Sequence, residues 1–120
     1  MSDILGIKVQ FAASNVHTPW GKADYRYTFP FRGVILYNTP GHGGLHLSTK
    51  FQKIMKLIFG NYMESYEWLE EDCNQFLFYL AFGKTMGIDE RNYAIVVENV
   101  KHWNPKAFAK FQESPLKVEI

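Results

Sequence analysis

Residues 33–47 read GVILYNTPGHGGLHL, and this stretch divides the chain into its strand-rich and helix-rich parts. Residues 33–37 form a short, continuous apolar run, which is typical of a strand buried on both faces of a sheet. Glycines at positions 41, 43 and 44 follow, and so many glycines cost too much backbone entropy for a regular helix or strand. We therefore predict a central strand over residues 33–37, a shaped loop over residues 38–44 and a strand that can resume at residues 45–47.

Two further strands are expected before this stretch. Ile7, Val9 and Phe11 alternate with polar residues within residues 4–11, and residues 23–29 alternate in the same way, which is the period of a half-buried strand. Residues 14–21 between them contain Asn, Pro and Gly, which favour a turn. The first third of the chain therefore predicts an antiparallel meander of about three strands, with a loop that displays Trp20.

Helices are expected after residue 47. Ser48 is a suitable N-cap for a helix that ends at Gly60. A second helix is predicted from about residue 65 or 66 to residue 82, with Gly83 as its C-terminal cap and acidic residues in its first two turns. Its predicted core stripe is Leu69, Cys73, Phe76, Leu77 and Leu80.

Two more helices complete the prediction. Asp89 is a good N-cap for a helix through residues 93–100, although the β-branched residues there leave a strand as the alternative. Asn104 and Pro105 are typical of the start of a fourth helix. Residues 116–120 alternate weakly and could add an edge strand. We expect an α+β fold in one domain, residues 1–120, with an antiparallel sheet of three to four strands from the N-terminal half packed against about four helices from the C-terminal half.

Composition limits the classes of function. The 120 residues are 47% hydrophobic and 21% charged with a formal net charge of +1, so a globular protein is expected and nucleic acid is an unlikely partner. The single cysteine, Cys73, excludes an internal disulfide and fits a reducing compartment such as the cytoplasm. No stretch is typical of a signal peptide or a membrane span. The 10 Phe, 7 Tyr and 3 Trp residues are more than such a core easily hides, which predicts an aromatic binding surface.

The glycine-rich segment is the first candidate site. His42, Gly43, Gly44 and His46 could bind a ligand, because glycines expose amide donors and histidines serve as acids, bases or metal ligands. The segment lacks the Gly-Lys-Ser/Thr ending of a phosphate-binding loop. A tight turn with locally bonded histidines is the structural alternative, and we expect no structural zinc and no cofactor.

The acidic segment 68–73 is the second candidate. Successive carboxylates cannot share one helix face, so a solvated first turn is the simplest interpretation, but Glu70 or Glu71 could be partly buried against an imidazole. Cys73 is interpreted as an inert core residue and not as a nucleophile. Trp103, beside Lys101 and His102, could stack on a ligand or act as a packing wedge.

Four segments occur in a characteristic order: TPWG at residues 18–21, TPGHGGLHLS at 39–48, WLEEDC at 68–73 and WNPKAF at 103–108. Together they resemble an uncharacterised bacterial domain family of plasmid and phage proteins, sometimes found near antirestriction genes. The resemblance implies a mobile-element setting in a bacterial host and no particular activity. It also suggests that the His42–His46 segment and the Glu70–Glu71 segment belong to one site.

Three classes of function follow. The leading hypothesis is a small counter-defence protein that binds a host defence protein or sequesters a small effector, because aromatic side chains give large contact area at low entropic cost. The alternative is a hydrolase or transferase that uses His42, His46, Glu70 or Glu71, with or without a metal ion. A structural module that assembles with a partner chain is the third, and the oligomeric state stays open. On any of these, we expect Trp20, the two histidines and Glu70 or Glu71 to surround one concave surface.

Overall fold

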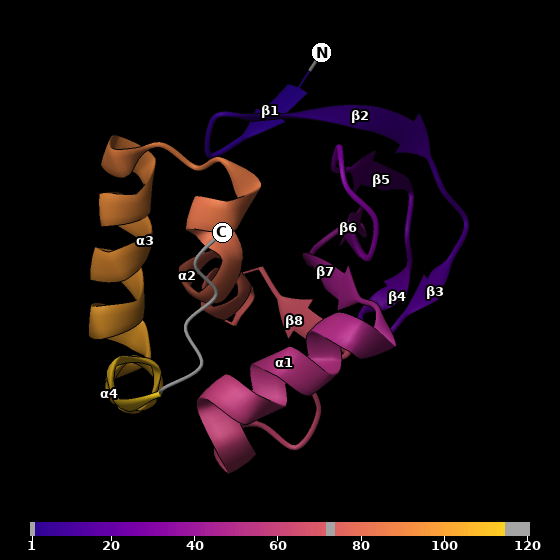
Figure 1. The fold of residues 1–120 in the computed structure, drawn as a ribbon. Helices are drawn as coiled ribbons and strands as arrows, with labels where there is room; N and C mark the ends of the chain where they lie inside the picture. Colours follow the sequence, from indigo (N-terminus) through magenta and orange to yellow (C-terminus); the bar gives the residue numbers. More distant parts are fainter. Residues whose placement is uncertain (1, 72–73, 115–120) are drawn as a thin grey trace.

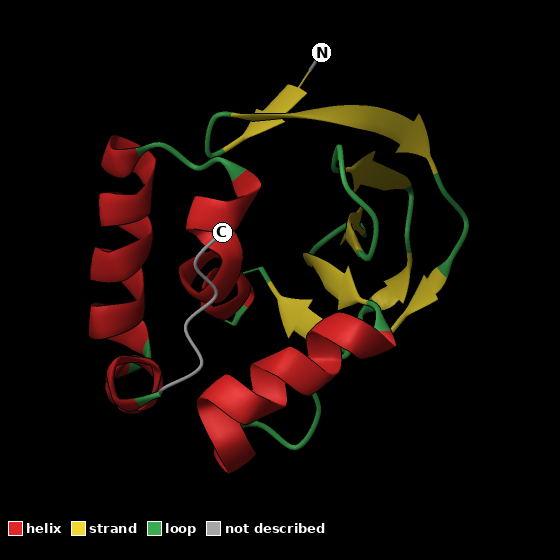
Figure 2. Ribbon diagram, viewed as in Figure 1, coloured by secondary structure: helices red, strands yellow, loops and turns green. Residues whose placement is uncertain are grey.

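A six-stranded antiparallel sheet, with strand order β1-β2-β5-β6-β7-β8, packs against the helices (Figures 1 and 2). Helix α1 lies between β7 and β8 in the chain, and the other α-helices follow β8. The computed structural model describes residues 2–71 and 74–114. The sheet strands are β1 Ser2–Ile4, β2 Ile7–Ala13, β5 Tyr25–Thr28, β6 Val34–Asn38, β7 Gly43–Leu47 and β8 Trp68–Glu70. A separate hairpin consists of β3 His17–Thr18 and β4 Gly21–Lys22. The helices are α1 Thr49–Phe59, the short 3-10 helix η1 Gly60–Tyr62, α2 Gln75–Met86, α3 Glu90–Trp103 and α4 Pro105–Glu113.

Helix α2 lies at the centre of the molecule. Its residues 77–83 are all buried, as expected for a helix that is apolar on all sides. Figure 1 shows α2 between α3 and the sheet, while α1 runs beside β7 and β8 and its C-terminal end meets α4. The core therefore forms between one face of the sheet and α2, with α1, α3 and α4 closing its sides. In the residues that the structure describes, no helix is long and apolar enough to cross a membrane.

Several sequence predictions are confirmed. The fold is α+β, and β2, β5 and β6 form the predicted antiparallel meander. Helix α1 begins after Ser48 and ends at Gly60. Residues 93–100 are helical, so the strand alternative is wrong, and the Asp89 side chain caps α3 by accepting a hydrogen bond from the Asn92 amide. Helix α4 begins at Pro105, directly after Asn104.

The prediction of three to four strands is wrong, because the sheet has six. Strand β1 pairs with β2 through a turn in which Leu5 has a φ of 52° and Gly6 a φ of 84°, and leucine is rarely found at a positive φ. Phe11, predicted to be half-buried, is 53% exposed because the helices do not cover that end of the sheet. The predicted strand over residues 116–120 lies outside the described residues.

The prediction that residues 38–44 are all loop is also wrong. Gly43 and Gly44 begin β7, where they pair with Asn38 and Tyr37 of β6. A Cβ atom on Gly44 would lie less than 3.0 Å from the carbonyl oxygen of Leu69 and from the ring of Trp20. Close packing of neighbouring groups on both sides, which excludes any side chain, therefore explains glycine at this strand position.

The predicted helix from residue 65 or 66 to residue 82 is wrong in its first half. Residues 68–70 form β8, an edge strand on β7, and α2 begins only at Gln75 and ends at Gly87. Consequently Glu67, Glu70 and Glu71 do not lie in a first helical turn, and Asp72 lies outside the described residues. Gly83, predicted as the cap, lies inside α2, where a Cβ atom would be 3.0 Å from the ring of Tyr93. The place of Cys73 on a core stripe lies outside the described residues.

Candidate functional site

The candidate site lies on the face of the sheet that points away from the helices, here called the outer face. Leu45 of β7 and its partner Leu69 of β8 are fully buried in the core. Because side chains alternate along a strand, the neighbours of these leucines point to the opposite side. The outer face therefore carries two cross-strand rows: Tyr37, Gly44 and Glu70, and next to them Ile35, His46 and Trp68.

The β3–β4 hairpin places Trp20 over Gly44. The Thr18 hydroxyl accepts a hydrogen bond from the Trp20 amide at 3.1 Å and donates one to the Gly21 carbonyl at 2.7 Å, which fixes the tight turn. The Cζ3 atom of Trp20 would lie 2.9 Å from a Cβ atom on Gly44. The absence of a side chain at residue 44 thus allows the indole to rest directly on the strand.

Trp68 is the centre of a group of rings on the outer face. Its ring centroid lies 5.9 Å from that of Trp20, which meets it edge-on, 5.8 Å from that of Tyr37 and 4.5 Å from that of His46. Such separations and angles are favourable for aromatic pairs. These four residues, Trp20, Tyr37, His46 and Trp68, are here called the aromatic cluster. The rings come from three different strands and a hairpin, so each contact also ties the hairpin to the sheet.

Two histidine–carboxylate pairs border the aromatic cluster. His46 Nε2 lies 3.0 Å from Glu67 Oε2, and His42 Nδ1 lies 3.7 Å from Glu70 Oε1. All four side chains are at least one-third exposed to solvent, so either pair contributes little to stability. The hydrogen bond with Glu67 orients the His46 ring and leaves Nδ1 available to a ligand, whereas the 3.7 Å distance between His42 and Glu70 is too long for a hydrogen bond.

Glu71 adjoins the same edge. Its amide donates a 2.8 Å hydrogen bond to the Gly43 carbonyl and extends the pairing of β7 with β8. Its carboxylate Oε2 would lie 3.1 Å from a Cβ atom on Gly43. The Glu71 side chain therefore borders the glycine at the start of β7.

The structure brings most of the predicted site residues together. Trp20, Gly44, His46 and Glu70 lie on or over the outer face, and His42, Gly43 and Glu71 lie at the end of β7 and β8. Trp103 does not belong to this group: it ends α3, is 63% exposed and contacts the His102 ring at 4.6 Å. The binding role of each of these residues stays a prediction.

Sequence reasoning missed three members of the site, namely Tyr37, Glu67 and Trp68. Tyr37 lies in the strand predicted over residues 33–37 and is buried, as expected there, whereas Glu67 and Trp68 fall in the stretch predicted as a helix. The sequence does contain a signal for a strand here. Leu69 is apolar and lies between Trp68 and Glu70, which both carry polar groups, and this alternation fits the period of a strand. Only the pairing of β8 with β7 shows that this alternation is the relevant pattern.

His42 and His46 do not share a carboxylate partner. His42 and His46 each face a different carboxylate, and residues four apart along an extended strand are separated by roughly 13 Å. Among residues 2–71 and 74–114, no group of three or more His, Cys, Asp and Glu side chains is placed to hold a metal ion.

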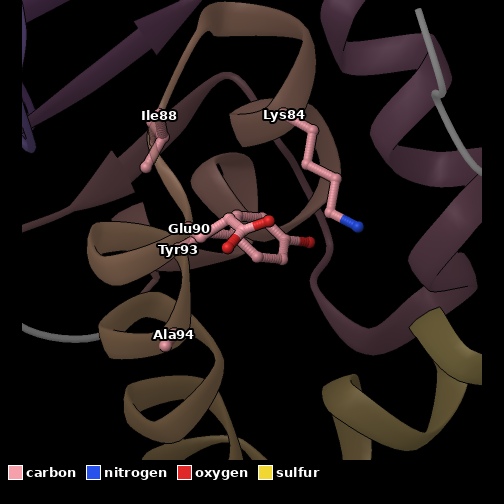
Figure 3. Close-up of a pocket in the computed structure, with 5 residues that line it drawn as sticks. All are labelled: Lys84, Ile88, Glu90, Tyr93 and Ala94. Atoms are coloured by element: carbon pink, nitrogen blue, oxygen red, sulfur yellow. The ribbon is translucent and has the colours of Figure 1, made fainter.

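A hollow of about 450 Å³ lies between α2 and α3 and is lined by Lys84, Ile88, Glu90, Tyr93 and Ala94 (Figure 3). The Tyr93 hydroxyl donates a 2.6 Å hydrogen bond to the Leu80 carbonyl, and burial raises the pKa of this phenol. The ammonium of Lys84 lies 5.4 Å from the centre of the Tyr93 ring. Tyr93 is thus engaged in packing α3 against α2, and the hollow lies apart from the outer face.

Comparison with known proteins places the chain in a family. Residues 13–119 match the family described as Domain of unknown function (DUF7007), and the chain belongs to this family. The match agrees with the resemblance to an uncharacterised domain family, whereas the plasmid or phage setting stays a prediction. Neither the curated proteins nor the solved structures contain a match to this chain.

Proposed function

We propose that this member of the DUF7007 family acts by binding. In this proposal it is a phage- or plasmid-encoded counter-defence protein that occupies a host defence protein, or sequesters a small effector, on the outer face of its sheet. The observation that carries the proposal is the position of Trp20, whose indole packs on Gly44 and against Trp68. The mobile-element setting is supported by the resemblance of the four sequence segments.

The aromatic cluster has the properties of a binding surface. Trp20 and Trp68 are each partly exposed, and their ring contacts with each other, with Tyr37 and with His46 hold them in place. A ring that is already immobilised loses little entropy when a partner covers it. Tryptophan and tyrosine are also the residues most often responsible for binding energy at interfaces. The neighbouring histidine–carboxylate pairs add polar contacts at the rim.

A hydrolase or transferase is the second candidate, and one observation favours it. The 3.0 Å contact between His46 Nε2 and Glu67 Oε2 is the arrangement that orients an imidazole for general-base work. His42 and Glu70 lie near each other at 3.7 Å, which is longer than a hydrogen bond. On this reading the titrating groups, and not the tryptophans, carry the activity.

The two candidates predict opposite rankings of variants. We would measure protection of a phage or plasmid in host cells for Trp20→Ala, Glu67→Gln and His42→Asn. Binding predicts that Trp20→Ala weakens the interaction by at least about 2 kcal/mol, roughly 30-fold. It also predicts that the two near-isosteric variants have a small effect, because they keep the shape and most hydrogen bonds. Catalysis predicts a loss of about 100-fold or more for Glu67→Gln or His42→Asn.

Phe11→Ala is the matched control. Phe11 is a large, 53% exposed aromatic residue of the same sheet, and its cross-strand partner Tyr27 pairs with core residue Leu36, so it lies on the opposite face. Circular dichroism and thermal melting must show that each variant is folded. Protection that survives Trp20→Ala but is lost in Glu67→Gln or in His42→Asn would rule out the binding proposal.

A further inference from the structure

The near-neutral net charge of the chain hides a strong separation of charge. Residues 49–60 contain Lys50, Lys53 and Lys56 and no carboxylate, and residues 101–112 contain Lys101, Lys106 and Lys110 and no carboxylate. Residues 61–72, in contrast, contain five carboxylates and no lysine or arginine. The formal charge of +1 is therefore an average over oppositely charged segments, and it does not describe the local field at either of them.

The two basic segments meet in the folded protein. Lys50, Lys53 and Lys56 are exposed on α1, on the side opposite its buried residues Met55 and Ile58. Helix α4 packs against α1 and η1 (Figure 1). The ammonium of Lys110 would lie 3.9 Å from a Cβ atom on Gly60, the residue that ends α1. The lysines of α1 and α4, Lys50, Lys53, Lys56, Lys106 and Lys110, are here called the basic face.

Among the described residues, few carboxylates lie near the basic face. None of its lysines forms an ion pair with a carboxylate in the part of the chain that the structure describes, where Lys101 pairs with Glu98 at 3.8 Å. Glu64 lines the same shallow hollow as Lys53 and Lys56, and Glu113 lies in the last turn of α4. Positive charge thus remains in excess over a surface comparable in size to the Debye length, about 10 Å at 0.1 M salt.

An exposed aromatic residue adjoins this charge. Trp103 ends α3, and α4 begins two residues later. The indole is 63% exposed, with the ring of His102 edge-on at 4.6 Å. Lys101 lies over the ring of Phe108 at 5.3 Å and so ties the end of α3 to α4. The free indole and the lysines of α4 therefore belong to one corner of the molecule.

We propose that the basic face binds single-stranded nucleic acid without sequence preference, with Trp103 stacking on a base. Lysine is depleted at interfaces between proteins, where arginine is enriched, and the basic face contains lysine alone. Lysines contact phosphates as point charges and carry no base-specific information. An exposed tryptophan next to such lysines is the usual means by which proteins hold unpaired bases. This surface is separate from the aromatic cluster and extends the protein beyond the proposed function.

The test measures binding of a fluorescent oligonucleotide of about 20 deoxythymidines by anisotropy, between about 50 and 200 mM NaCl. We expect binding at low salt. The logarithm of the association constant should fall linearly with the logarithm of the salt concentration, with a slope of about −0.7 for each phosphate neutralised. Lys53→Glu with Lys110→Glu should weaken binding at least tenfold and reduce this slope. Trp103→Ala should weaken binding at least fivefold and leave the slope unchanged, because stacking releases no counterions.

Lys8→Glu with Arg91→Glu is the matched control, since it changes the net charge equally at exposed positions on β2 and at the start of α3. This variant should bind within threefold of the unaltered protein. Three results would overturn the proposal: no binding at about 50 mM NaCl, an equal loss in both double variants, or competition by poly-glutamate as strong as that by unlabelled oligonucleotide. The last would indicate an acidic protein partner. None of these results bears on the effect of Trp20→Ala, so the proposed function is tested separately.

Discussion

Replacement of Gly44 by alanine tests two features together: the place of Gly44 in strand β7 and the packing of Trp20 on it. The new Cβ atom would lie less than 3.0 Å from the Leu69 carbonyl oxygen and from the Trp20 ring. Both groups must give way: β8 must move away from β7, and the β3–β4 hairpin must lift Trp20 from the sheet. Neither shift is local, because Leu69 is fully buried in the core and Trp20 also contacts Trp68.

The expected cost follows from these contacts. Overpacking of a close-packed site costs about 1–3 kcal/mol, and here a backbone oxygen is one of the two clashing groups, so we expect at least about 2 kcal/mol. With an unfolding entropy of about 2.1 cal/mol/K per residue, this corresponds to a Tm lower by about 8 °C in a chain of this length. A glycine in an open loop would behave oppositely, because alanine there stabilises by about 0.4–1 kcal/mol.

The assay compares thermal unfolding of Gly44→Ala and Gly41→Ala, followed by circular dichroism and tryptophan fluorescence. Gly41 is the matched control: neither glycine has a positive φ, and a Cβ atom on Gly41 meets nothing within 4 Å. Gly41→Ala should melt at or slightly above the temperature of the unaltered protein. If Gly44→Ala is as stable as Gly41→Ala, then the packing of Trp20 and β8 around Gly44 is not as described.

Two further predictions concern the helices. Asp89→Ala should lower the free energy of unfolding by about 1 kcal/mol, because the Asp89 side chain caps α3 through a 2.8 Å hydrogen bond from the Asn92 amide. Ser48→Ala should lower it less in the same urea titration, since Ser48 makes no side-chain cap bond to α1. Equal losses in the two variants would contradict the capping role of Asp89. Burial raises the pKa of Tyr79 above its ordinary value of 10.0, so the unfolded chain ionises this phenol at a lower pH than the folded protein, and stability should fall as the pH rises above about 10. Tyr79→Phe should reduce this fall in urea titrations at successive pH values, and an unchanged pH dependence would contradict burial as its cause.

The helices and strands that depend on neighbouring residues alone were predictable from the sequence. Strand periodicity located β2 and β5, and an unbroken apolar run located β6. Ser48 and Gly60 mark the ends of α1, and Pro105 marks the start of α4. Gly60 ends α1 with a positive φ, and the fixed φ of Pro105 suits the first turn of α4, so no distant contact is needed to recognise either effect.

The candidate site depended on contacts between distant residues. Residues 68–70 form a strand because β7 offers them an edge to pair with, and this pairing brings Glu67 to His46 and Glu70 to His42. Locally, the same residues fit a helix start equally well. The co-occurrence of the sequence segments suggested that the histidines and carboxylates belong together, but the members Tyr37 and Trp68 were missed.

The sequence by itself determined an α+β chain with a strand meander first and helices after it, because hydrophobic period and capping are properties of neighbouring residues. Only the tertiary structure decided that Gly43 and Gly44 lie in a strand. Gly43 lies close to the Tyr37 carbonyl and Gly44 to the Leu69 carbonyl and the Trp20 ring, so the missing side chains allow close packing and do not serve a turn. It also decided that α4 packs against α1, which brings Lys110 of α4 next to Gly60 at the end of α1. Net charge and local propensity are sums along the chain, whereas a binding surface depends on which segments the fold brings side by side.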